Sequence, residues 1–234
     1  KACSPELRTR VFNTIEKYDY RPNQVARGLI NHKTRLVGIV TPKVSNAFHA
    51  EFISQIEAEA DRAHYNVIIS NILGNFENEK KTFRIMKDRQ VDGIILLHEN
   101  TPDEMRELEE IVDFPIVLAS VRVKDSLLPT VAITDERAAF EAARYLCQLG
   151  HVRIAGVFSD SYSTGTLRRK GVLEGLQSWG IDRNSISLYT TECSFGGGIA
   201  VATEIKNQKN LPSLIFLSFN NVNRKDSRTK KPIP

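Results

Sequence analysis

Few residues of this sequence have the spacing that catalysis or metal binding requires. The chain contains no G-x-S-x-G nucleophile elbow, no H-E-x-x-H zinc motif and no Walker-type phosphate loop. The histidines and cysteines also lack metal-ligand spacing. They are His32, His49, His64, His98, His151, Cys3, Cys147 and Cys193. We therefore expect no enzyme, no metal and no cofactor, and the lack of C-x-x-C pairs favours a reducing cytoplasm.

Several polar and aromatic residues instead stand near the ends of expected strands, where they suit ligand binding. Phe48 offers a flat apolar face for a ring, and Arg168 offers a bidentate donor for hydroxyl or carboxylate groups. Asp135, Asn46 and Asn220 add polar contacts. This mixture predicts a site for a small polar ring compound such as a sugar or a base. The alternative is that each of them is an ordinary loop residue.

Two further features have plain structural interpretations beside their functional ones. His98 follows an expected strand and could face the same ligand, but a loop histidine is the simpler interpretation. Gly196-Gly197-Gly198 follows no strand in a G-x-G-x-x-G frame, so a flexible helix start is favoured over a phosphate site.

A basic stretch near the N-terminus could contact nucleic acid. Arg21, Asn23, Arg27 and Lys33 could meet phosphates, and Leu29 on a short helix could wedge between base steps of a minor groove. The alternative is a solvated linker. Residues 1–35 carry eight Lys and Arg against three acids, and residues 223–234 carry five against one. The segment between them is acidic, so the N-terminal arm is the part expected to meet a polyanion.

The elements that position these residues read as repeated β-α-β units. Apolar strands are expected at 36–40, 67–71, 93–97, 116–119, 130–133, 154–158, 186–189 and 214–217. Amphipathic helices are expected at 47–64, 76–89, 102–111, 136–149, 166–179 and 197–208. This alternation predicts an α/β fold with parallel sheets that are covered on both faces. Ligands of such sheets bind outside the carboxyl ends of the strands.

The two ends of the chain differ from this pattern. Ser4-Pro5-Glu6 predicts a helix start, and the apolar stripe of Leu7, Val11 and Ile15 predicts a helix that ends near Tyr18. Residues 23–31 could form two weak helical turns, because Gly28 lowers helix propensity by about 1 kcal/mol. The tail from 222 is expected to be disordered. Neither a signal peptide nor a membrane helix is expected.

Taken in order, several motifs resemble the lactose/galactose-repressor family of bacterial transcription regulators. They are Arg8-x-Arg10-Val11, Tyr20-Arg21-Pro22-Asn23-x-x-Ala26-Arg27-x-Leu29, Val37-Gly38-Ile39-Val40-x-Pro42, Ser45-Asn46-x-Phe48, Val91-Asp92-Gly93-Ile94-Ile95, Leu149-Gly150-His151-x-Arg153-Ile154-Ala155, Arg168-x-x-Gly171 and Pro212-Ser213-x-Ile215-Phe216 leading to Asn220. They span about residues 4–221, and the set in this order is specific.

The resemblance implies a domain order and roles for residues. It implies a remnant of a helix-turn-helix head, its third helix, at 1–22, a hinge helix and linker at 23–34, a first α/β lobe at 35–133, an incomplete second lobe at 134–221 and a disordered basic tail at 222–234. The lobes would form a periplasmic-binding-protein-like core. It places Ser45, Asn46, Phe48, Arg168 and Asn220 at the effector. It places Arg21, Asn23, Ala26, Arg27 and Leu29 in the DNA-contacting hinge.

The resulting hypothesis is a cytoplasmic, ligand-responsive transcription regulator, a repressor, that lacks parts at both ends. Its expected partners are operator DNA, a small effector such as a sugar, and a second copy in a homodimer, with no membrane. Cys193 stands where many members have an aromatic ring, and Gly28 and Asn221 also depart from the family pattern. The alternatives are a free-standing solute-binding protein of the same core fold and an enzyme on an α/β scaffold, for which no constellation is present.

Overall fold

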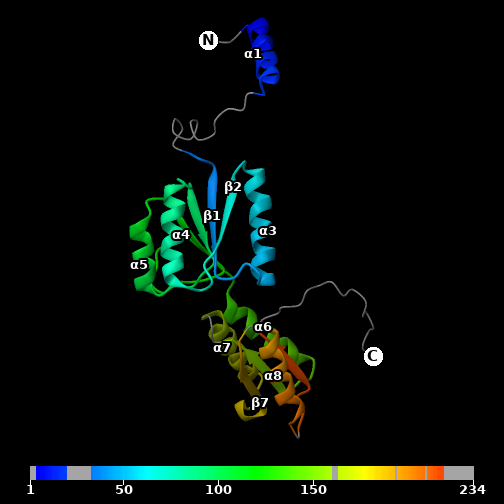
Figure 1. The fold of residues 1–234 in the computed structure, drawn as a ribbon. Coiled ribbons are helices and arrows are strands. Elements are labelled where there is room, and N and C mark those ends of the chain that lie inside the picture. The colour runs from blue at the N-terminus through cyan, green and yellow to red at the C-terminus, as the bar shows by residue number, and fades with distance from the viewer. Residues whose placement is uncertain (1–3, 20–32, 160–162, 193, 209, 219–234) are drawn as a thin grey trace.

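The computed structural model describes residues 4–19, 33–159, 163–192, 194–208 and 210–218 (Figure 1). The expected hinge helix at 23–31 and the expected disordered tail at 222–234 lie outside these residues. Within them the α/β fold with parallel sheets is confirmed, because every described strand pair is parallel.

The first sheet has five strands in the order β2-β1-β3-β4-β5. Their bounds are β1 (Leu36–Thr41), β2 (Asn66–Asn71), β3 (Gly93–Leu96), β4 (Ile116–Ala119) and β5 (Thr130–Val131). The chain leaves β1 toward β2 and then crosses to β3 on the other side, so the winding direction reverses between β1 and β3.

Helices cover both faces of this sheet, as Figure 1 shows. They are α3 (Ala47–Arg62), α4 (Phe76–Asp88) and α5 (Pro102–Ile111). Phe83 and Met86 of α4 and Leu108 of α5 form one apolar cluster with the sheet, whereas Ile53 of α3 packs on Ile39 from the opposite face. Two-sided burial explains why the strands read as nearly continuous apolar runs.

The second sheet has three strands in the order β7-β6-β8. Its elements are α6 (Asp135–Gln148), β6 (Ile154–Phe158), α7 (Ser163–Ser178), the 3-10 turn η1 (Arg183–Ser185), β7 (Ile186–Thr190), α8 (Phe195–Lys206) and β8 (Leu214–Leu217). Ala143 of α6 and Leu176 of α7 pack on one face, and Val201 of α8 packs on the other. The winding reverses between β6 and β8.

Within the described residues, the expected strands and helices of the two sheets are present, with small shifts at their ends. Helix α7 begins at Ser163, three residues before the expected start at 166. Strand β5 keeps only Thr130–Val131 of the expected 130–133, and both residues are exposed, so the predicted strand was too long. The three consecutive glycines lie in the first turn of α8, as expected.

Helix α1 (Pro5–Lys17) forms where the capping pattern predicted it. The Ser4 hydroxyl accepts a hydrogen bond from the Leu7 amide, Pro5 follows the cap, and Tyr18 ends the helix. None of its residues is buried, and Leu7, Val11 and Phe12 are each about half exposed. Its apolar stripe therefore has no packing partner among the described residues.

The side chain of Asp92 ties the chain segment before β1 to the start of β3. One carboxylate oxygen accepts from the amide of Thr34 at 2.8 Å and from its hydroxyl at 3.0 Å. The other accepts from the amide of Arg35 at 3.1 Å. Arg35 has a left-handed backbone with φ of 56°, so the chain turns sharply at this clamp before it enters β1.

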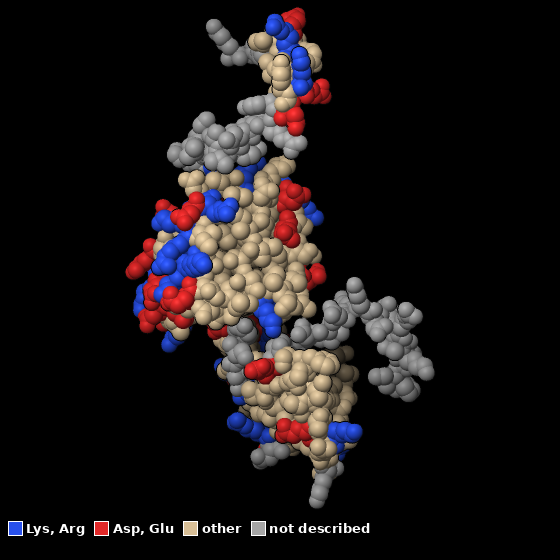
Figure 2. Space-filling view, viewed as in Figure 1, with Lys and Arg blue, Asp and Glu red and all other residues tan. Residues whose placement is uncertain are grey.

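Charged side chains are spread unevenly over the first lobe. Figure 2 shows acidic and basic residues interspersed over α4 and α5, while the neighbouring face in this view is largely uncharged. Lys80 of α4 lies 2.7 Å from Glu77 and 3.4 Å from Glu107 of α5. The hydrogen bond to Glu77 is the largest of the effects that raise the pKa of Lys80.

No described helix is long and apolar enough to cross a membrane.

Close backbone contact between α6 and α7 depends on glycine. A Cβ atom at Gly171 would clash with the carbonyl oxygen of Glu136, and one at Gly175 would lie 2.6 Å from that of Phe140. Both glycines are buried. The two helices can therefore approach this closely only because α7 has no side chains at these positions.

We expect Gly171→Ala to lower the free energy of unfolding by roughly 1–3 kcal/mol, because α7 must move away from α6. Gly198→Ala is the matched control. Gly198 lies in α8 with open space around it, so alanine there should be neutral or stabilise by about 0.5–1 kcal/mol. Urea unfolding curves measure both effects. Equal stability of the two variants would contradict the close-packing explanation.

His49 holds the loop that follows β1. Its Nδ1 lies 3.1 Å from the hydroxyl of buried Thr41 and 3.2 Å from the carbonyl oxygen of Lys43. Burial lowers the pKa of His49 below its usual 6.5, and the hydrogen bond to Lys43 acts more weakly in the opposite direction. The folded state therefore binds the proton less tightly than the unfolded state does.

We expect this histidine to make the fold less stable in acid. Its contribution is complete above pH 6.5 and is lost as pH falls from 6.5 toward the lower pKa of the folded state. His49→Gln should lose less stability than the wild type between pH 7 and pH 5 in urea titrations. The control is His64→Asn, which removes an exposed histidine outside this loop, at a left-handed φ of 59° that asparagine tolerates. A wild-type slope in His49→Gln would contradict the assignment.

Candidate functional site

The candidate site lies where the winding direction of each sheet reverses. In open α/β sheets such points leave a crevice outside the carboxyl ends of two neighbouring strands. In the first sheet the strands are β1 and β3, followed by residues 42–48 and 97–101. In the second they are β6 and β8, followed by Ser159 and Ser218. Most of the residues expected at an effector fall in these segments or on helices that begin there.

After β1, helix capping decides how the expected residues are placed. The side-chain oxygen of Asn46 accepts a hydrogen bond of 2.9 Å from the amide of Phe48 and so begins α3. Its oxygen is thus engaged by the protein. Phe48 is 49% exposed and stacks on Phe52 with ring centroids 5.8 Å apart. Ser45 is exposed. Phe48 therefore offers a supported aromatic surface of the kind a ring compound stacks on.

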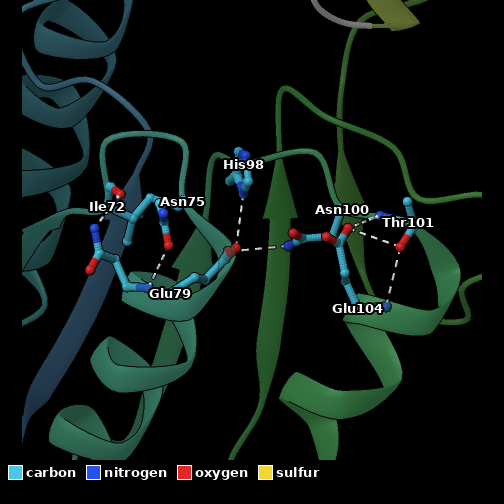
Figure 3. A network of polar contacts seen from close by, with 8 residues as sticks. Ile72, Asn75, Glu79, His98, Asn100, Thr101 and Glu104 are labelled. Carbon is cyan, nitrogen blue, oxygen red and sulfur yellow. Dashed lines mark hydrogen bonds and ion pairs between the residues drawn. The ribbon is translucent and has the colours of Figure 1, made fainter.

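After β3, His98 belongs to a buried polar network (Figure 3). Its Nδ1 lies 2.9 Å from a carboxylate oxygen of Glu79, which has no solvent exposure. The other oxygen of Glu79 accepts from the amide nitrogen of Asn100 at 3.1 Å. Asn100 is also buried, and among the described residues its side-chain oxygen has no hydrogen-bond partner. His98 is therefore held more firmly than a plain loop histidine would be.

In the second lobe the structure brings together two residues that were expected at the effector. Nε of Arg168 on α7 lies 2.6 Å from a carboxylate oxygen of Asp135 at the start of α6. Nη1 of Arg168 donates to the carbonyl oxygen of Ser218, which follows β8. The side chain of Asp135 is 5% exposed and that of Arg168 is 30% exposed. The guanidinium is thus oriented by two fixed acceptors at the carboxyl end of the second sheet.

A hydrogen bond between described residues joins the loop after β3 in the first lobe to α7 in the second. The amide of Ser163, the first residue of α7, donates to the carboxylate of Glu99 at 2.9 Å. Glu99 is the neighbour of His98, and Ser163 begins the helix that carries Arg168. A carboxylate at a helix N-terminus is also favoured by the helix dipole.

A surface pocket of about 510 Å³ lies beside the ion pair of Asp135 and Arg168. Of the residues expected at the effector, Asp135 lines this pocket. It is lined by Arg122, Ile133, Thr134, Asp135, Glu136, Arg137, Phe140, Leu167 and Glu174. Ser45, Asn46, Phe48, His98 and Arg168 do not line it. In the part of the chain that the structure describes, no three His, Cys, Asp or Glu side chains form a metal-binding group.

The remaining expected site residues lie outside the described residues. They are Asn220 at the effector and Arg21, Asn23, Ala26, Arg27 and Leu29 in the DNA-contacting segment.

Glu79 is the residue that sequence reasoning missed. It stands on the buried stripe of α4 with Thr82, Phe83 and Met86, at spacings of three, four and seven residues. An acid on the apolar stripe of a helix signals a buried charge that needs donors. Its partners, 19 and 21 residues later in the chain, have no such signal.

The chain was also compared with known proteins. Residues 34–215 match the family of periplasmic binding proteins and sugar-binding domains of the LacI family. The chain is 34% identical over 221 residues to catabolite control protein A of Priestia megaterium, and 32% identical over 223 residues to the HTH-type transcriptional regulator DegA of Bacillus subtilis. These alignments take in 91% and 94% of the chain, which spans 65% and 66% of the two relatives.

Solved structures show the same fold at lower identity. Transcription regulator CcpA of Lactococcus lactis matches with a TM-score of 0.67 and 23% identity, over 80% of this chain and 68% of that one. The Cra dual regulator of Pseudomonas putida, solved with fructose 1-phosphate, matches with a TM-score of 0.67 and 21% identity, over 78% and 68%. With a family match across most of its length, the chain belongs to the family of periplasmic binding proteins and LacI-type sugar-binding domains.

Proposed function

We propose that this chain acts in a ligand-responsive, DNA-binding transcription regulator, a repressor, whose core binds a small polar effector such as a sugar. The observation that carries the proposal is the extent of the alignments with two regulators. They take in 91% and 94% of the chain, which is more than the segment from residue 34 to the end. The likeness therefore continues into the N-terminal arm, which a free-standing solute-binding protein would not need.

The proposal gives each segment a role. Residues 1–22 contribute a helix to the DNA-binding head, 23–34 form the hinge, and 35–133 and 134–221 form two lobes around the effector. Ser45, Asn46, Phe48 and His98 contact the effector from the first lobe, and Asp135, Arg168 and Asn220 contact it from the second. The protein works in the cytoplasm as a homodimer, and Arg21, Asn23, Ala26, Arg27 and Leu29 contact operator DNA.

Regulation then follows from linkage between two binding sites. An effector that contacts both lobes favours the lobe angle at which those contacts are best. In a dimer a change of that angle moves the two hinge segments relative to each other. Such short helices are marginal in isolation, so a small bias decides whether they fold on DNA.

Arg168→Lys tests the effector site. Lysine keeps the positive charge but lacks the planar guanidinium group, whose several N–H donors can bind Asp135 and a ligand at the same time. We therefore expect the affinity for sugar to fall by about tenfold or more. Isothermal titration over a panel of sugars, sugar phosphates and purines measures it. Arg62→Lys is the control, because Arg62 pairs with Glu59 on the exposed surface of α3 and does not line the pocket beside Asp135. Unchanged affinity in Arg168→Lys would rule out its contact, and a panel without any binder would refute the effector site.

Leu29→Ala tests the DNA-contacting segment in the full-length protein. A minor-groove wedge favours the bent operator, so its loss should weaken specific operator binding by about tenfold or more. Binding to unrelated DNA rests on phosphate contacts and should stay unchanged. Gel-shift titrations at one fixed salt concentration compare the two. Wild-type operator affinity in the variant would disprove the wedge.

A further inference from the structure

Glu79 is a carboxylate without solvent exposure at the candidate site of the first lobe. A buried carboxylate is costly unless donors surround it. The partners that the structure gives it are Nδ1 of His98 at 2.9 Å and the amide nitrogen of Asn100 at 3.1 Å (Figure 3). Both follow β3, whereas Glu79 comes from α4, so the network pins the loop after β3 to a neighbouring helix.

The carboxylate decides which ring nitrogen of His98 carries a proton. An ionised carboxylate only accepts hydrogen bonds, so the proton between the two groups belongs to Nδ1 of His98. For the same reason the side-chain amide of Asn100 is oriented with its nitrogen, a donor, toward the accepting oxygen of Glu79. Nε2 of His98 lies on the opposite side of the ring and points away from Glu79 (Figure 3). The side chain of His98 keeps 15% of its surface exposed.

The backbone around His98 is also fixed on both sides. The amide of Leu97 donates to the carbonyl oxygen of Val40 in β1 at 2.8 Å. Thr101 and Glu104 form a reciprocal capping box that begins α5. His98 thus stands between a strand and a helix start with little freedom to turn, which is the support a specificity-determining side chain needs.

We propose that Glu79 is a positioning residue that fixes His98 with Nδ1–H toward the protein interior, so that Nε2 reads a hydroxyl group of an uncharged effector. The inference rests on the proposed function, because it refines the ligand of that site. With Nδ1–H engaged, Nε2 of a neutral ring can only accept a hydrogen bond. A hydroxyl can donate that bond, and it can also accept one if the ring takes a second proton.

An anionic group fits this arrangement poorly. A phosphate dianion or a carboxylate has no proton to donate to a neutral Nε2. If the ring takes a second proton, its positive charge is already balanced by the carboxylate of Glu79, which lies 2.9 Å from Nδ1. On the other lobe the guanidinium of Arg168 already has the carboxylate of Asp135 at 2.6 Å. Because His98 and Arg168 are each matched by a carboxylate of the protein, the pair favours a neutral polyhydroxyl ligand such as a sugar over a sugar phosphate.

The first experiment measures the tautomer directly. Two-bond ¹H–¹⁵N spectra of the wild-type chain distinguish a protonated from a bare Nδ1. The His98 signal is assigned by its loss in His98→Gln or, if that variant does not fold, by contacts to Leu97. We expect a protonated Nδ1 in the wild type and a mixture of tautomers in Glu79→Gln. A bare Nδ1 in the wild type would overturn the role of Glu79, whether or not any variant folds.

Glu77→Gln is the matched control for this measurement. Glu77 belongs to the same helix, and its side chain is 76% exposed and pairs with Lys80. The chemical change is the same, so an effect of the helix or of net charge would appear in both variants. We expect the His98 signal of Glu77→Gln to match the wild type. An equal change in both variants would overturn a specific action of Glu79 on His98.

The second experiment compares neutral sugars with their phosphate esters by isothermal titration, with fructose and fructose 1-phosphate as one pair. We expect the neutral member of a pair to bind more tightly, and Glu79→Gln to reduce its affinity by about tenfold while Glu77→Gln does not. Tighter binding of the phosphate esters would overturn the inference and leave a sugar-responsive regulator intact. If no sugar of either kind binds, the proposed effector class and the hydroxyl reading both fail, while the tautomer spectra still decide whether Glu79 orients His98.

Discussion

Two buried carboxylates that must find donors organise the candidate site, one in each lobe. Glu79 takes its donors from the loop after β3, and Asp135 takes the guanidinium of Arg168. A buried carboxylate left without its partner costs on the order of 3 kcal/mol or more, so each acid holds its donor in one geometry. His98 and Asn100 follow β3, and Arg168 on α7 donates to the carbonyl oxygen of Ser218 after β8. The donors of both acids therefore meet the carboxyl edge of a sheet, beside the point where its winding reverses. The fold brings these side chains to the carboxyl edges of the two sheets, and the acids orient them there.

The ion pair of Asp135 and Arg168 depends on close backbone contact between α6 and α7. Asp135 opens α6, while Arg168 stands on α7 less than one turn before Gly171. Because Gly171 and Gly175 let α7 lie directly on the α6 backbone, the carboxylate and the guanidinium meet at 2.6 Å. A larger residue at either glycine would separate the helices and lengthen that ion pair. The arginine is consequently preorganised by helix packing as well as by its own hydrogen bonds.

The sequence was sufficient for the elements and insufficient for their long-range pairs. Apolar runs and helical stripes located the strands and helices because local periodicity follows burial. Helix caps such as Asn46 could also be predicted from the sequence. The sequence did not show that the side-chain oxygen of Asn46 already accepts a hydrogen bond from the backbone in forming this cap. Asp135 and Arg168 were expected at one site without any indication that they pair. Glu79 was missed altogether, since an acid in the first turn of a helix is usually explained by the helix dipole, although this one stands on the apolar stripe.

The first sheet also connects the candidate site with the N-terminal arm. At their amino ends, β1 and β3 are joined to the arm by the clamp of Asp92 on Thr34 and Arg35. At their carboxyl ends, the same two strands lead to Asn46 and His98. Six residues of β1 span roughly 20 Å of hydrogen-bonded, buried strand, which does not stretch when a ligand binds. In the proposed regulator, a signal from effector to arm is therefore not expected to travel as a deformation along these strands. The proposed mechanism is instead a rigid-body movement of the first lobe against the second, driven by a ligand that contacts both and has unequal affinity for the two lobe angles.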